Sequence, residues 1–178
     1  MKALRLAAYL FVAILMAGFA LAFGVYQSYS ELAQLNLEAK SRFSSWEAAG
    51  SPADDLLSEL TDMTNPYDSR ARTIAEHARD ELAENSAGSS PDAAIHRHLL
   101  RAKAIRDVAG IASEYPQLIQ SDLFKEWRGS YEAQRLVSES ALQGYNDAAG
   151  KYNRVLDSFS GKVISLLFTV PPKPAIPG

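Results

Sequence analysis

Residues 124–159, FKEWRGSYEAQRLVSESALQGYNDAAGKYNRVLDSF, carry the longest unbroken helical pattern in the chain and decide its fold class. Apolar and aromatic residues recur there at alternating steps of three and four. The positions of this stripe are Phe124, Trp127, Tyr131, Gln134, Ser138, Ala141, Tyr145, Ala148, Tyr152, Val155 and Phe159. Leu142, Ala149 and Leu156 widen the stripe to the face of a bundle helix. We therefore expect a helix over residues 121–159 that packs against other helices.

The tyrosines of this stripe need hydrogen-bond partners if they are buried, because a phenol hydroxyl loses its water on burial. Gln134 is placed to supply one partner, and Asn146 and Asn153 can supply others if they turn inward. Aromatic residues at this spacing usually form a core. A cofactor pocket is the less favoured alternative.

Three further helical segments precede this stretch, and clear breaks separate them. The expected helices cover residues 27–49, 53–84 and 91–115. Gly50-Ser51-Pro52 ends the first, and the composition of residues 85–90 predicts a loop. Asn65-Pro66 predicts a kink or a break within the second, because proline removes a backbone donor and clashes with the preceding turn. No useful strand-like alternation occurs, so we expect an all-α antiparallel four-helix bundle over residues 27–168.

An apolar segment without a charge covers residues 6–26, and residues 1–26 are therefore expected to form a cytoplasmic stub and a transmembrane anchor. At about 1.5 Å per residue, this helix reaches about 30 Å, which is the thickness of a bilayer core. Lys2 and Arg5 precede the segment, so the positive-inside rule places the N-terminus in the cytoplasm. Tyr26 and Tyr29 stand where the outer membrane interface is expected.

A cleaved signal peptide is the competing interpretation of this segment, since Ala20-Leu21-Ala22 resembles a cleavage site. Two features favour the anchor. The apolar run is longer than the roughly 7–15 residues of a signal-peptide core. The helical pattern also continues past the segment without a breaker, so we expect the anchor to run into the first helix of the bundle.

The C-terminal end of an antiparallel bundle on such an anchor is expected to return toward the membrane. The apolar segment 163–168 would then lie near the bilayer surface. It can dock on the bundle, which we favour, or enter the membrane interface. Residues 169–178 are rich in proline and cannot be helical, so we expect an extended or disordered tail, with disorder favoured.

Composition excludes several kinds of site. The chain contains no cysteine, which excludes disulfides and thiolate chemistry, and its net charge of −3 argues against nucleic acid as a partner. His77, His96 and His98 lack the acidic residue three positions earlier that a di-iron bundle site uses. No nucleophile elbow or phosphate loop occurs. We expect no catalytic site, no metal and no cofactor.

The C-terminal half carries a motif that consists of Tyr115, Pro116, Leu118, Phe124, the pairs Tyr145-Asn146 and Tyr152-Asn153, Phe159, and an apolar segment ending in Phe168. This motif resembles that of the LemA family. The match is good from about Ile95 to Phe168 and looser before it. Near Asp55 the family's double arginine is replaced by Pro52-Ala53, so the chain looks like a divergent member.

The resemblance implies a bacterial membrane protein with one N-terminal span and an antiparallel helical bundle outside the cytoplasm. Members of the family are thought to work beside other envelope components, including membrane proteases. We therefore expect a scaffold or interaction protein of the inner (cytoplasmic) membrane, whose partners are the lipid bilayer and an envelope membrane protein. The alternative is a periplasmic ligand-sensing bundle that signals through a partner, because the sequence offers no second span of its own.

Overall fold

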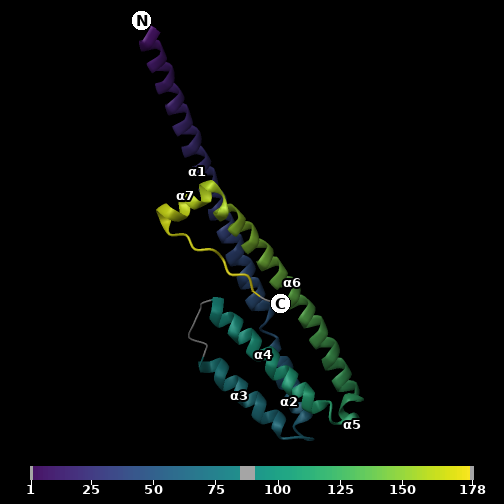
Figure 1. Ribbon diagram of the computed structural model, residues 1–178. Coiled ribbons are helices and arrows are strands. Elements are labelled where there is room, and N and C mark those ends of the chain that lie inside the picture. The colour runs from purple at the N-terminus through teal and green to yellow at the C-terminus, as the bar shows by residue number, and fades with distance from the viewer. Residues whose placement is uncertain (1, 85–90, 177–178) are drawn as a thin grey trace. The chain divides into compact units, whose positions relative to one another are not determined.

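The computed structural model describes residues 2–84 and 91–176, and it describes side chains from residue 9 onward. The regular elements of this part are all helices, as expected from the sequence (Figure 1). They are α1 (Lys2–Ala49), α2 (Ala53–Thr64), α3 (Arg70–Glu84), α4 (Pro91–Ala112), α5 (Pro116–Ile119), α6 (Asp122–Asp157) and α7 (Phe159–Phe168). The loop expected over residues 85–90 lies outside the described residues.

The chain divides into two compact units. The first, here called the terminal unit, comprises Met1–Arg42 and Gly144–Pro177. The second, here called the central unit, comprises Phe43–Gln143. The long helices α1 and α6 each contribute residues to both units.

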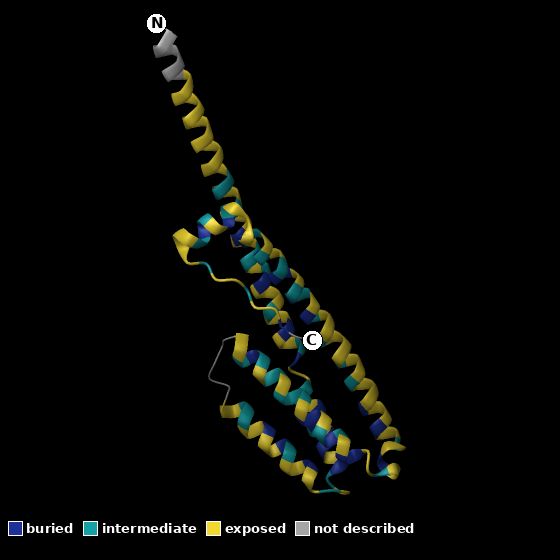
Figure 2. Ribbon diagram, viewed as in Figure 1, coloured by how far each residue is buried: buried dark blue, intermediate teal, exposed yellow. Residues whose placement is uncertain are grey.

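The terminal unit begins with the apolar half of α1, in which residues 9–23 are exposed (Figure 2). Phe19, for example, is 75% exposed. Among the described residues, this is the one helix long and apolar enough to cross a membrane. Such side chains are costly to leave in water, and the other described residues do not cover them.

The core of the terminal unit joins α1, α6 and α7. Leu32 of α1 packs with Tyr152 and Leu156 of α6 and with Ile164 of α7. The chain turns sharply between α6 and α7, where the Ser158 side chain accepts a hydrogen bond of 3.1 Å from the backbone N–H of Gly161. This N-cap starts α7, which runs sideways from the end of α6 (Figure 1).

The central unit has a larger core, built mainly from α2, α3 and α4. Leucines of α2 meet small side chains of α3, which lets the helices approach closely. The buried members are Leu56, Leu57, Leu60, Ala71, Ala75, Ala78, Ala104, Ile105, Val108, Ala112, Leu118, Phe124 and Trp127. The indole N–H of Trp127 donates to the backbone oxygen of Leu56 at 2.9 Å, which fixes the start of α6 on α2.

The break expected at Asn65-Pro66 is present, and residues 53–84 form two helices, α2 and α3. The helix expected to end at residue 159 ends at Asp157, and Phe159 instead starts α7 with its side chain exposed. A serine that caps a new helix is a local signal that the heptad pattern does not contain.

Candidate functional site: the Tyr–Asn face of α6

The Tyr–Asn face of α6 consists of Tyr145, Asn146, Tyr152 and Asn153, and it binds the backbone of the C-terminal tail. Asn153 donates through Nδ2 to the oxygen of Lys173 and accepts at Oδ1 from the N–H of the same residue, both at 2.8 Å. Asn146 makes the same pair of bonds with Ile176, at 2.8 and 2.9 Å. Each amide thus satisfies both polar groups of one tail residue.

The two tyrosines complete the row of hydrogen bonds to the tail. The Tyr145 hydroxyl donates to the backbone oxygen of Pro174 at 2.9 Å, and the Tyr152 hydroxyl donates to that of Pro171 at 3.4 Å. Burial raises the pKa of both phenols, so they remain protonated donors at neutral pH. The expected partner Gln134 lies elsewhere and donates to the backbone oxygen of Ala49.

Few side chains of the tail take part in this contact. Ile176 is buried to 4% exposure, and Val170 packs against the core of the terminal unit. The ammonium of Lys173 lies 5.5 Å from the centroid of the Tyr152 ring, within cation–π range. Burial and the nearby charge of Lys40 lower the pKa of Lys173. Recognition is therefore mostly of backbone, with one apolar anchor.

The tail is thus extended and bound over residues 170–176, in contrast to the disorder that its composition favours. A proline-rich segment offers few N–H groups, which disfavours helix and sheet. It does not prevent binding by side chains that accept from the remaining N–H groups. The side-chain oxygens of Asn146 and Asn153 are such acceptors. From the sequence, these asparagines were expected to be partners of the tyrosine hydroxyls.

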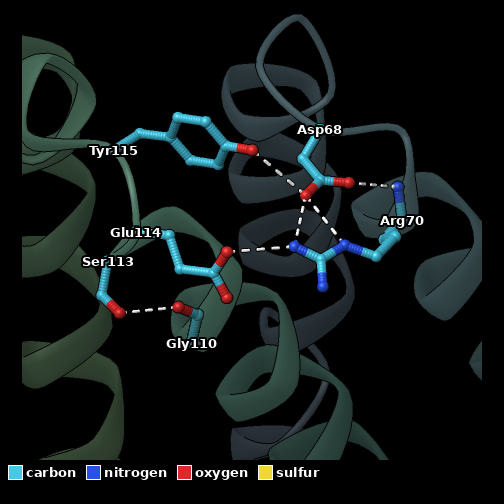
Figure 3. Close-up of polar contacts among 6 residues, drawn as sticks. All are labelled: Asp68, Arg70, Gly110, Ser113, Glu114 and Tyr115. Carbon is cyan, nitrogen blue, oxygen red and sulfur yellow. Dashed lines mark hydrogen bonds and ion pairs between the residues drawn. The ribbon is translucent and has the colours of Figure 1, made fainter.

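Tyr115, the first residue of the family-like motif, belongs to a polar cluster in the central unit (Figure 3). Its hydroxyl donates to Asp68 Oδ2 at 3.2 Å. Arg70 donates to the same carboxylate oxygen through Nε at 2.8 Å and through Nη2 at 2.6 Å, and it reaches Glu114 at 3.0 Å. The cluster ties the α2–α3 connection to the end of α4.

Asp68 also starts helix α3, because its Oδ1 accepts from the backbone N–H of Arg70 at 2.9 Å. The hydrogen bonds from Arg70 lower the pKa of Asp68 to about 2. Burial and the bond to Asp68 raise the pKa of Tyr115. We interpret this cluster as structural, since each polar group in it is directed at another residue of the same unit.

The remaining motif positions fall into two groups. Pro116 starts α5, and Leu118 and Phe124 lie in the core of the central unit. Phe159 and Phe168 are exposed on α7, and the Phe168 ring lies 5.7 Å from the ring of Tyr29. Tyr26 and Tyr29, assigned to the membrane interface, are both exposed on α1. The motif therefore marks three separate places in the molecule.

The sequence interpretation did not identify the tail residues that the Tyr–Asn face binds. A usable signal was present. Asn146 and Asn153 are seven residues apart on the expected helix. In the tail, the non-proline residues 173 and 176 are three apart, and prolines stand at 171, 172 and 174. Asp68 and Arg70 were also missed, because their roles depend on the break between α2 and α3.

No group of three or more His, Asp or Glu that could hold a metal ion occurs within residues 2–84 and 91–176. The ring of His98 lies tilted against the ring of Trp46, with the centroids 5.2 Å apart. Burial and, to a smaller extent, the charge of Arg101 lower the pKa of His98. Compared with known proteins, the chain matches no family model and no curated protein.

Proposed function

We propose that the chain is a single-pass membrane protein of the bacterial envelope and acts as a scaffold for another membrane protein. In this proposal, the apolar half of α1 spans the inner membrane with its N-terminus in the cytoplasm, and residues 27–168, which include the second half of α1, form an antiparallel four-helix bundle in the periplasm. The chain would be a divergent relative of the LemA family. A membrane protease is one candidate partner.

The observation that carries this proposal is the exposed apolar half of α1. Its residues 9–23 are all exposed in the structure, and the bilayer is the environment that would cover them. Helix α7 supports the same placement. It buries Ile164 against α1 and α6, but it leaves Leu166 86% exposed, together with Leu167 and Phe168.

These exposed residues of α7 favour an interfacial position at the level of Tyr29. Phe168 contacts the ring of Tyr29. Tyr29 lies three residues after the end of the apolar segment 6–26. An apolar helix edge beside an interfacial tyrosine can enter the headgroup region while its other edge stays on the protein. Docking and membrane contact are then compatible, whereas the sequence offered them as alternatives.

Single-cysteine labelling tests the topology, and the cysteine-free chain is suited to it. Ala3→Cys lies before the span, and Ser140→Cys lies on an exposed position of α6. A membrane-impermeant maleimide should label Ser140→Cys in intact bacterial spheroplasts and Ala3→Cys only after lysis. The reverse pattern would overturn the orientation.

Cleavage is tested on the same preparations. The mass of the mature chain should equal the full sequence, and the protein should remain in the membrane after carbonate extraction. A mass that corresponds to a chain starting after residue 22, together with release of the protein into the soluble fraction, would overturn the anchor.

The scaffold role is tested by crosslinking in membranes followed by solubilisation and affinity capture. The same membrane protein should be recovered in repeated experiments and lost when the bundle is deleted after residue 30. Recovery of no reproducible partner would overturn the scaffold role and leave the anchor standing.

A further inference from the structure

We propose that the Tyr–Asn face of α6 is a binding site for extended, proline-interrupted peptide segments, and that the C-terminal tail is its tethered internal occupant. The inference deepens the proposed scaffold function, on which it rests, by naming the site and the kind of segment it takes. In this proposal, a segment of a partner protein replaces the tail on α6.

The spacing of the two asparagines matches an extended peptide. Asn146 and Asn153 are seven residues apart, which is about 10.5 Å along a helix. Their tail partners, Ile176 and Lys173, are three residues apart, which is about 9.3 Å in a polyproline II segment. The side-chain amides can absorb the difference of about 1 Å. The two segments run in opposite directions.

The hydrogen bonds define which tail positions exclude proline. Asn153 accepts from the N–H of Lys173, and Asn146 accepts from that of Ile176, so these two positions require an N–H. At Pro171 and Pro174 the face uses only the backbone oxygen, which proline retains. The site therefore reads a pattern of N–H groups three residues apart and tolerates proline between them.

The binding mode is suited to exchange. Four tail residues, at positions 171, 172, 174 and 175, are exposed, and Ile176 is the one fully buried anchor among residues 169–176. Backbone hydrogen bonds of this kind are also available to any other extended chain. The tail competes because it is tethered, with an effective concentration of about a millimolar for a short connection. A stronger or better-placed segment would displace it.

The test uses the full chain in detergent and a variant that ends at Thr169, which lacks the tail but retains every helix. The probe is a fluorescently labelled peptide with the sequence of residues 169–178, and its binding is measured by anisotropy. The shortened chain should bind it at least about tenfold more tightly than the full chain, whose own tail competes. Circular dichroism verifies that both chains have the same helix content.

Site and peptide variants separate this recognition from nonspecific adhesion. Asn153→Leu in the shortened chain should weaken binding by at least about tenfold, because two hydrogen bonds are lost. Lys151→Leu, at an exposed position of the same helix, is the matched control and should leave binding unchanged. A peptide with Lys173→Pro should lose binding, whereas a peptide with Ala175→Pro should retain it.

A folded shortened chain that fails to bind the peptide would overturn the proposal, as would equal binding by Asn153→Leu. If the shortened chain loses helix content, Lys173→Pro in the full chain serves instead. It retains the whole sequence, removes one N–H, and should bind the peptide more tightly than the unmodified chain; unchanged binding would overturn the proposal. These results are independent of the crosslinking experiment, so failure here leaves the scaffold proposal standing.

Discussion

The central unit and the terminal unit are each stabilised internally by a different kind of interaction. In the central unit, leucines and small side chains of α2, α3 and α4 form a continuous apolar core. In the terminal unit, a smaller core is supplemented by amide and phenol groups that bind the backbone of the tail. Apolar packing of the first kind is hard to exchange, since it depends on shape. Backbone recognition of the second kind can accept another chain, and this places the exchangeable part of the protein on α6.

The two tryptophans provide a selective probe of this difference. Trp46 and Trp127 are the only tryptophans of the chain, and both belong to the central unit. Tryptophan fluorescence therefore reports on the central unit. Amide exchange at α7 and the tail reports on the terminal unit.

The largest effect is expected from Leu60→Ala in the central core. Leu60 is fully buried, with 0% exposure, and its loss should cost about 2–5 kcal/mol through lost burial and a cavity. Urea unfolding followed by tryptophan fluorescence measures this. Leu136→Ala on α6 is the control, because Leu136 is 60% exposed and its truncation should change stability by less than about 0.5 kcal/mol. Equal effects of the two variants would contradict the assignment of the core.

The next effect concerns the turn between α6 and α7. A Cβ at Gly161 would lie 2.1 Å from the backbone oxygen of Val155, so Gly161→Ala must displace α7, at about 1–3 kcal/mol. Faster amide exchange across Phe159–Phe168 should report it. Gly150→Ala is the matched control. A Cβ there meets nothing within 4 Å, so the change should stabilise α6 by roughly 0.5–1 kcal/mol. If the amide hydrogens of α7 remained protected from exchange in both Gly161→Ala and Gly150→Ala, the turn would not be tightly packed.

The third prediction concerns acid stability through Asp68. Its pKa is lowered from 3.8 to about 2 in the folded chain, so its contribution is complete above about pH 4. The contribution is lost as the pH falls through 2. Asp68→Asn should lower the thermal midpoint at pH 7 by less than Leu60→Ala does, and it should weaken the dependence on pH between 4 and 2. Asp122→Asn, an exposed carboxylate in the first turn of α6, is the control. An identical pH profile for both variants would contradict the role of Asp68.

The sequence predicted helices and most of the buried face of α6 because both depend on local periodicity. Trp127, Tyr145 and Tyr152 are buried as the stripe requires. The stripe failed at Phe159, where the Ser158 cap starts a new helix and the side chain is exposed. Periodicity fixes which face of a helix is apolar, but it does not fix where the axis turns.

The sequence predicted one part of the candidate site, the side chains of α6, but not the tail that they bind. The pairs Tyr145-Asn146 and Tyr152-Asn153 were identified as a motif, and inward-facing asparagines were considered as partners for tyrosine hydroxyls. The structure gives both residue types the same partner, the tail backbone. A contact between segments about 20 to 30 residues apart, made through backbone atoms, leaves little trace in side-chain patterns. The positions of the non-proline residues are its main trace.

The smallest effect is expected at the side chain of Lys173, and it separates backbone from side-chain recognition. Lys173→Met keeps the N–H that Asn153 binds and removes the ammonium over Tyr152. The lost cation–π contact is worth about 0.5–1 kcal/mol, and relief of the buried charge beside Lys40 offsets part of it. Exchange of the amide hydrogens at residues 173 and 176 should therefore change by only a few-fold, compared with a large loss of protection at residue 176 in Lys173→Pro. Comparable loss in both variants would mean that the lysine side chain, and not the backbone, holds the tail on α6.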